Sequence, residues 1–94
     1  MSAHIDSFLD YLRLERAYSP RTVQSYEMDL NEFEAYLRRT DAELTLVTVD
    51  ADNVRNWTME MMEAGQKETS VTRRLSALRS FYRYLLRKGV VEVS

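Results

Sequence analysis

The part of the chain that decides the fold is 69-TSVTRRLSALRSFYRYLLRK-88, its most strongly periodic stretch. One face of this stretch repeats at intervals of four, three, four and three residues and consists of Val71, Leu75, Leu78, Tyr82 and Leu85. That spacing predicts a long amphipathic helix over about 69–88. Arg87 and Lys88 would complement the helix dipole in the last turn, and Gly89 would let Val90 fold back on Leu85 in a Schellman-type ending.

The opposite face of this helix carries arginines and hydroxyls and no acidic residue. At about 100° per residue it consists of Thr69, Arg73, Ser76, Ser80, Arg83 and Arg87, flanked by Thr72 and Arg79. A solvated face usually mixes charges so that i,i+4 pairs form, and arginines without intrahelical partners therefore favour an external anion. Hydroxyls and guanidinium groups are common DNA-contacting groups. An ordinary solvated surface is the other interpretation of the same pattern.

A second amphipathic helix is predicted from Ser19-Pro20, an N-cap followed by proline in the first turn, to about Arg39. Its inward stripe is Val23, Tyr26, Leu30, Phe33 and Leu37. Near its start the opposite face holds Arg21, Gln24, Ser25 and Met28. Helix N-termini also attract phosphate, so this end is a second candidate for anion contact, although Ser19 and Thr22 cap the helix in either case.

Two shorter helices complete the expected fold. The first is marked by Ile5, Phe8, Leu9 and Leu12 and ends near Ala17-Tyr18. The other begins after Asp50 as its N-cap, with Val49 and Val54 placed as a hydrophobic staple. It buries Trp57 and Met61 and ends at Gly65. The β-branched run 44–49 has no partner strand, so we expect an extended connection that tucks apolar side chains beneath the helices. The predicted fold class is all-α, a compact four-helix bundle.

Composition limits the possible functions. The 94 residues suffice for one domain, and the net charge of -2 conceals a segregation. Residues 41–65 hold one basic and six acidic groups, whereas residues 66–94 hold seven basic and two acidic groups, a local balance of +5. Such asymmetry is typical of a protein with one phosphate-facing surface, although basic helix surfaces also occur without that role.

Catalytic and metal-binding signatures are missing from the sequence. There is no cysteine, and His4 is the one histidine. No nucleophile stands beside a base, and no glycine loop could cradle a phosphate. Helix capping and solvation account for Asp50, Asp52 and Glu60 more simply than a cation site does. We expect no cofactor and no metal. The chain also has no apolar run long enough for a bilayer and no signal peptide, which predicts a cytoplasmic protein without membrane contact.

Three quoted segments carry a family resemblance: 19-SPRTVQSY-26, then Asp29-Leu30 with Phe33, and 72-TRRLSALRSFYRYL-85 followed by Gly89. They resemble the core-binding domain of tyrosine recombinases, the phage integrase family, and look closest to Xer-type proteins. The resemblance implies a SAM-like helical domain that forms half of a clamp around duplex DNA. It implies contacts from Arg21, Thr22, Gln24, Ser25, Met28, Thr69, Thr72, Arg73, Ser76 and Arg79, to which the helix face adds Arg83. Arg74 matches a basic position of the family but lies at the core flank by its helical angle.

The same resemblance implies that breakage and joining chemistry belongs to a separate C-terminal domain. We therefore expect residues 1–94 to form a single DNA-binding domain of a longer recombinase or integrase, with no catalytic residue of its own, monomeric alone and tetrameric on DNA as part of the parent protein. With a net charge of -2, one half of a clamp should hold DNA loosely. The competing hypothesis is a helical adaptor that binds an acidic protein partner through the basic face of residues 69–88.

Overall fold

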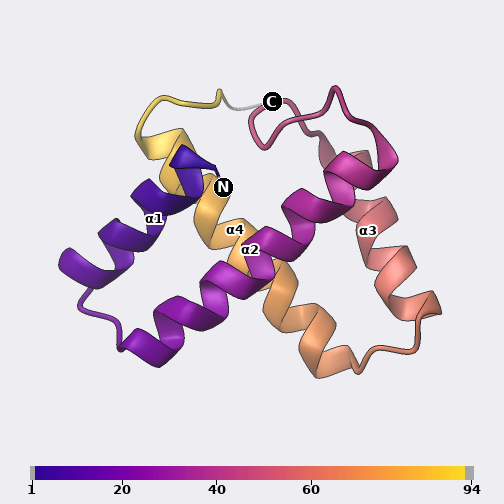
Figure 1. Cartoon of the computed structure of the whole chain (residues 1–94), viewed down its shortest axis with the longest axis horizontal. Coiled ribbons are helices and arrows are strands. Elements are labelled where there is room, and N and C mark those ends of the chain that lie inside the picture. Colours follow the sequence, from indigo (N-terminus) through magenta and orange to yellow (C-terminus); the bar gives the residue numbers. More distant parts are fainter. Residues whose placement is uncertain (1, 93–94) are drawn as a thin grey trace.

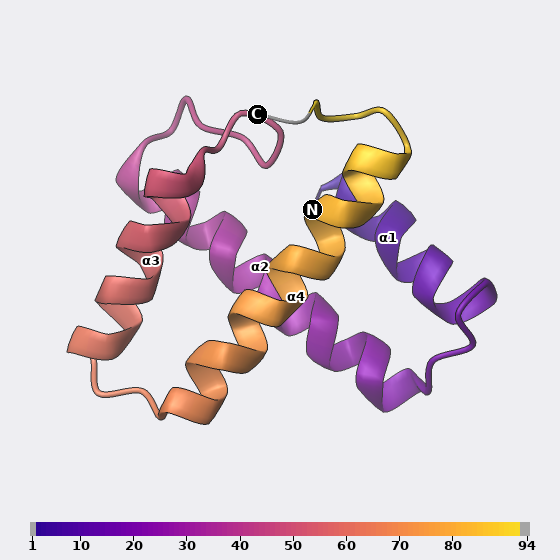
Figure 2. The same cartoon turned by 180° about the vertical axis from the view of Figure 1, so that it is seen from behind.

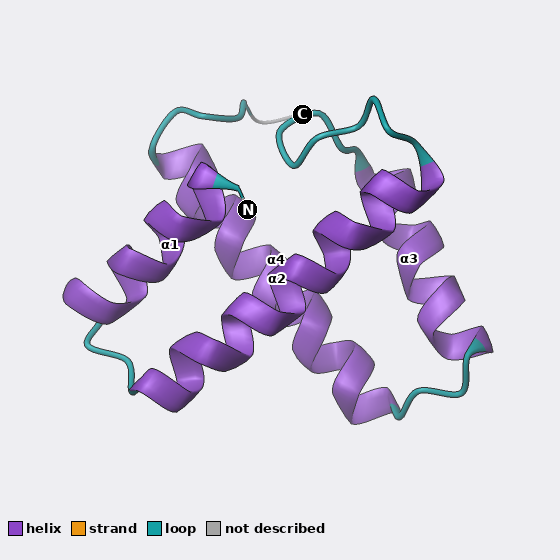
Figure 3. Ribbon diagram, viewed as in Figure 1, coloured by secondary structure: helices purple, strands orange, loops and turns teal. Residues whose placement is uncertain are grey.

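Two long helices, α2 (Pro20–Thr40) and α4 (Glu68–Arg87), cross at the centre of the molecule (Figures 1 and 2). The shorter helices α1 (Ala3–Leu14) and α3 (Ala51–Glu63) flank the crossing, and each packs on both long helices. The structure is a computed structural model that describes residues 2–92. Within that range it contains four helices and no strand (Figure 3), which confirms the predicted all-α class. None of these helices is long and apolar enough to cross a membrane.

The helix boundaries follow from local capping. The Ser19 hydroxyl accepts the Thr22 backbone N–H at 3.2 Å and starts α2. Asp50 and Asn53 cap each other's backbone N–H groups at 3.0 and 2.9 Å and start α3. These starts confirm the sequence-based predictions, because a cap depends on residues only three positions apart.

A residue with positive φ follows α1, α3 and α4, whereas α2 ends at Asp41 in an extended conformation. Gly65 and Gly89 have φ values of 81° and 75°, and the Val90 N–H donates to the Leu85 carbonyl at 2.9 Å, which confirms the Schellman-type ending of α4. α1 ends at Leu14, earlier than predicted. The chain leaves it through Ala17, a non-glycine residue at φ 53°.

The core is broader on α4 than the sequence pattern predicts. Val71, Leu78 and Leu85 are buried as expected, whereas Leu75 and Tyr82 are only partly buried. The predicted inward stripe did not include Phe81 and Tyr84, whose exposed fractions are 0% and 5%. Their rings lie 5.5 and 5.4 Å from the ring of Phe8 on α1. Because α4 is contacted by all three other helices, it buries a wider sector than one amphipathic stripe.

The connection between α2 and α3 packs against α4 without forming a strand. Leu46 is buried, Leu44 and Val49 are partly buried, and the Tyr82 hydroxyl donates to the Leu46 carbonyl oxygen at 2.6 Å. The connection tucks apolar side chains under the helices as expected, but the prediction that it is extended is wrong. It turns twice, through the Leu44 N–H to the Asp41 carbonyl and the Thr48 N–H to the Thr45 carbonyl, both at 3.1 Å. Val47 is the exception, because its side chain remains exposed.

Burial raises the pKa of Tyr82 above its usual value. A raised pKa means that the phenol's contribution to stability is complete below the unfolded-state pKa of about 10 and is lost as the pH rises beyond it. We expect Tyr82→Phe to lower the unfolding free energy by about 1 kcal/mol at neutral pH, through loss of the bond to Leu46. Urea unfolding above pH ~10 should show this deficit shrinking. A deficit that does not change with pH would contradict the assignment.

Candidate nucleic-acid interface

A cleft of about 290 Å³ lies between the N-terminal halves of α2 and α4. Its wall on α2 consists of Arg21, Thr22, Ser25, Tyr26 and Asp29, and its wall on α4 consists of Arg73, Ser76 and Ala77. The two helices diverge from their crossing toward their N-terminal ends (Figure 2). The fold thus brings together five residues that the sequence pattern proposed as DNA contacts: Arg21, Thr22, Ser25, Arg73 and Ser76.

The other proposed contact residues lie outside the cleft. Gln24 and Met28 are exposed on α2, and Met28 leaves 57% of its surface accessible. On α4 the proposed contact residues outside the cleft are also exposed: Thr69, Thr72, Arg79 and Arg83. These side chains lie on the exposed surfaces of the same two helices and do not line the cleft. The candidate site is therefore a surface centred on the cleft, which we call the α2/α4 face, and it comprises the eleven proposed residues.

Arg73 differs from the expectation that the arginines of α4 have no partner. Its Nε and Nη2 atoms donate to Oδ2 and Oδ1 of Asp29 on α2, at 3.1 and 2.9 Å. These hydrogen bonds raise the pKa of the Arg73 guanidinium. The prediction considered partners on the same helix, and this partner is 44 residues away in the sequence.

Arg87 is also partnered, and by an aromatic residue. Its Nη2 donates to the Tyr11 hydroxyl at 3.0 Å, and its guanidinium lies 5.3 Å from the centre of that ring. The remaining arginines of the α2/α4 face are Arg21, Arg79 and Arg83. None of the three has a carboxylate within 4.0 Å among residues 2–92. They are the cations of this face that lack internal compensation in the described structure.

Arg74 joins α2 to α4 instead of facing solvent. Its side chain is 15% exposed, and its Nε lies 2.7 Å from Oε2 of Glu32 and 3.7 Å from Oδ1 of Asp29. It also donates to the side chain of Gln66. The flanking position inferred from its helical angle is therefore correct. Its partners show a structural role at the crossing of the two helices.

Asp29 is the residue of this site that the sequence analysis did not single out by chemistry. It is 2% exposed and is the one buried charged residue in the described part of the chain. The available signal was an acid beside the apolar stripe of α2, next to Leu30. Its partner could not be inferred, because the pairing depends on how α2 crosses α4.

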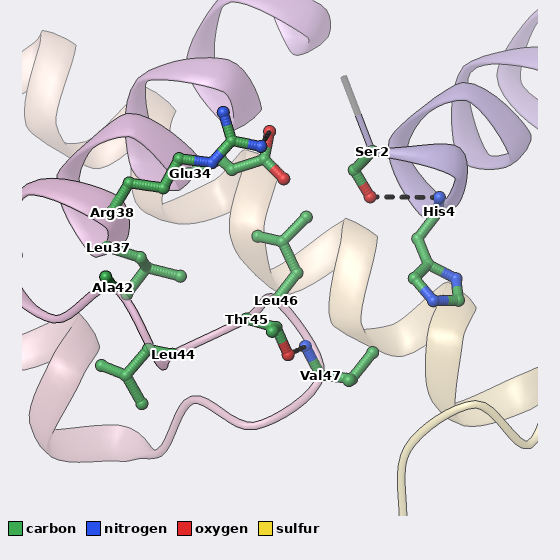
Figure 4. A pocket seen from close by; sticks show the side chains of 10 residues that line it. All are labelled: Ser2, His4, Glu34, Leu37, Arg38, Ala42, Leu44, Thr45, Leu46 and Val47. Carbon is green, nitrogen blue, oxygen red and sulfur yellow. Dashed lines mark hydrogen bonds and ion pairs between the residues drawn. The ribbon is translucent and has the colours of Figure 1, made fainter.

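A separate hollow lies between the N-terminus of α1, the end of α2 and the connection that follows (Figure 4). Ser2 uses its hydroxyl to cap the His4 backbone N–H at 3.1 Å, and Glu34 pairs with Arg38 at 3.7 Å. In Figure 4 the His4 ring lies well apart from Glu34 and Arg38. The hollow thus gathers no acid-base pair around its histidine.

The acidic residues weighed as a cation site have separate partners. Asp50 caps α3, Asp52 pairs with Arg55, and Glu60 accepts from Arg39 through both oxygens at 3.0 and 2.8 Å. The hydrogen bonds from Arg39 lower the pKa of Glu60. Among residues 2–92 no group of three or more His, Cys, Asp or Glu side chains is placed to hold a metal ion.

Fold and site together define a small all-α domain of the SAM-like class, with an arginine- and hydroxyl-lined cleft between its two crossing helices. The chain belongs to the family described as phage integrase, N-terminal SAM-like domain, whose profile matches residues 5–89. This confirms the family resemblance seen in the sequence. It also assigns the chain to the N-terminal part of such proteins.

The chain is similar to tyrosine recombinases of the Xer type. It is 41% identical to tyrosine recombinase XerC of Lacticaseibacillus casei over 88 residues, which cover 94% of this chain and 30% of that protein. It is 38% identical to XerC of Pelotomaculum thermopropionicum, covering 98% of this chain and 31% of that protein. It is 37% identical to XerD of Rhizobium meliloti, and the match covers 95% of this chain and 28% of that protein. The chain thus spans about 30% of the length of these curated relatives. No solved structure matches it significantly.

Proposed function

We propose that this domain binds duplex DNA through the α2/α4 face and positions a tyrosine recombinase on its site. The observation that carries the proposal is the convergence of Arg21, Thr22 and Ser25 on α2 with Arg73 and Ser76 on α4 around one cleft. Guanidinium and hydroxyl groups are the side chains that most often contact phosphate and base edges. The names of the relatives, which describe recombinases, support DNA as the partner.

The acidic average of the chain does not oppose this function. The acidic groups of residues 41–65 belong to α3 and to the connection before it, whereas most basic groups of residues 66–94 belong to α4. None of these acidic groups lines the cleft. We expect the local charge of the α2/α4 face to govern phosphate binding, because exposed charges farther apart than a Debye length are largely screened. We further propose that residues 1–94 act as one DNA-binding domain, in the cytoplasm, beside a C-terminal catalytic domain, and that the parent protein assembles as a tetramer on DNA.

The salt dependence of binding tests this proposal. If Arg21, Arg73, Arg79 and Arg83 each neutralise one phosphate, the logarithm of the association constant should fall with the logarithm of salt with a slope of about -3 to -4. Between about 50 and 200 mM salt this amounts to a loss of roughly 100-fold. Fluorescence anisotropy of a labelled duplex measures the slope directly. We expect weak binding, with dissociation constants in the micromolar range or above at physiological salt.

The same titration separates DNA binding from the adaptor hypothesis. Arg73→Ala combined with Arg79→Ala should weaken duplex binding and make the salt slope shallower by about two. Absence of duplex binding by the unmodified chain at low salt, or binding that ignores salt, would count against a DNA-binding function. A protein-binding adaptor would leave the duplex unbound and would bind an acidic protein through the arginines of α4.

A further inference from the structure

The α2/α4 face contains a buried carboxylate directly behind one of its arginines. Asp29 is 2% exposed, and both of its oxygens accept hydrogen bonds from Arg73. A carboxylate removed from water is costly unless it is paired and hydrogen-bonded, so the position of Arg73 is tied to the packing of α2 against α4. The Arg73 side chain is nevertheless 52% exposed, because only one side of it faces Asp29.

The hydrogen-bonding capacity of Arg73 is only partly used by this contact. A guanidinium group has five N–H donors in a rigid plane. Asp29 takes the Nε donor and one donor of Nη2. The Nη1 donors and the second Nη2 donor remain available on an exposed group that lines the cleft with Arg21 and Ser76. Asp29 therefore fixes one edge of the guanidinium plane and leaves the opposite edge directed away from the protein core.

Fixing an arginine before binding changes what it contributes. A free arginine side chain populates many rotamers, and part of that rotamer entropy is lost when it contacts a ligand. Arg79 and Arg83 have no ion pair in the described structure and would lose that entropy on binding. In Arg73 most of it has already been lost on folding, through the two bonds to Asp29. Planar, oriented donors also suit recognition of paired acceptor atoms.

We propose that Asp29 is a positioning residue for DNA binding, which holds the Arg73 guanidinium so that its free edge meets a pair of acceptor atoms on the duplex. The inference rests on the proposed function of the α2/α4 face. Two sources on DNA offer such a pair: the oxygens of one phosphate, and O6 with N7 of guanine in the major groove. Asp29 touches no DNA in this arrangement and acts only through Arg73.

The proposal predicts that Asp29→Asn changes DNA affinity in the direction opposite to the one that charge alone would produce. Asp29→Asn removes one negative charge next to the cleft, so Coulomb attraction alone would strengthen binding to a polyanion. Loss of positioning would weaken it, by about three- to tenfold for one newly mobile side chain. Glu32→Gln is the matched control. It removes one negative charge from the same helix, and Glu32 pairs with Arg74 and not with Arg73.

The experiment titrates a labelled random-sequence duplex with the 94-residue chain and its variants at fixed low salt. We expect Asp29→Asn to bind about three- to tenfold more weakly than the unmodified chain, whereas Glu32→Gln binds equally or more tightly. In the Arg73→Ala background, Asp29→Asn should cause no further loss, because no guanidinium is left to position. An A·T-only duplex identifies the acceptor source, because it retains phosphates and lacks guanine.

Circular dichroism melts of each variant show that the titrations compare folded chains. If Asp29→Asn proves too unstable, Arg73→Lys keeps both Asp29 and the charge. It should bind more weakly than the unmodified chain and more tightly than Arg73→Ala, since an ammonium group attracts phosphate but lacks the planar fork. Equal or tighter duplex binding by Asp29→Asn, or binding by Arg73→Lys as tight as that of the unmodified chain, would overturn the positioning role of Asp29 while leaving DNA binding intact. Failure of the unmodified chain to bind duplex would instead overturn the proposed function itself.

Discussion

Replacing Phe81 by alanine is expected to lower the midpoint of thermal unfolding by about 15–30 °C. Phe81 is fully buried, and its ring packs 5.5 Å from Phe8 on α1 and 5.2 Å from Tyr82. Large-to-small replacements of buried aromatic residues cost about 3–5 kcal/mol, which combines lost burial with the cavity left behind. A domain of this size has a total stability of roughly 5–14 kcal/mol, so the variant should be marginally folded.

Leu86→Ala provides the control for this prediction. Leu86 lies on the same helix, is also a large apolar residue, and is 42% exposed. Its replacement should cost less than about 1 kcal/mol, because few of its contacts are lost on truncation. Calorimetry or a circular dichroism melt of both variants measures the difference. Similar midpoints for the two would show that Phe81 does not lie at the meeting point of α1 and α4.

Reversing two charges on the outer face of α4 should abolish measurable DNA binding. Arg79 and Arg83 are exposed and have no ion pair within residues 2–92, so Arg79→Glu with Arg83→Glu should leave the fold intact. Arginine and glutamate also have similar helix propensities. The double reversal removes two phosphate contacts and adds two repulsive charges, for an expected loss on the order of 100-fold or more at low salt. Anisotropy titration of a labelled duplex measures this loss.

A second pair of substitutions distinguishes the effect of the α2/α4 face on DNA binding from the effect of the net charge of the chain. Arg38→Glu with Arg55→Glu changes the net charge by the same amount, and these exposed arginines lie at the end of α2 and on α3, away from the cleft. We expect this pair to reduce binding only by several-fold, through weaker long-range steering. If both double variants lose binding equally, then net charge rather than the α2/α4 face governs the interaction.

Part of the candidate site could be predicted from helical periodicity. The outer face of residues 69–88 and the start of 20–39 were identified because a hydrophobic stripe defines its own opposite side. Five of the proposed residues then converge at one cleft in the folded chain, while the others lie on adjacent exposed surfaces. Their individual contacts with DNA stay predictions. The sequence pattern indicated that Arg73 and Arg87 lack partners on their own helix, and the structure gives them partners on other helices, Asp29 and Tyr11.

The sequence by itself determined the four helices and most of their limits, the end of α1 at Leu14 being the exception. Ser19, Asp50, Gly65 and Gly89 act within a few residues, through caps and left-handed backbone angles, so their effects can be read without knowing the fold. The tertiary structure alone decided that Phe81 is buried and that Asp29 pairs with Arg73 across 44 residues of chain. Both depend on the way α1 and α2 pack across α4, and a packing geometry between distant segments leaves no periodic trace in either one.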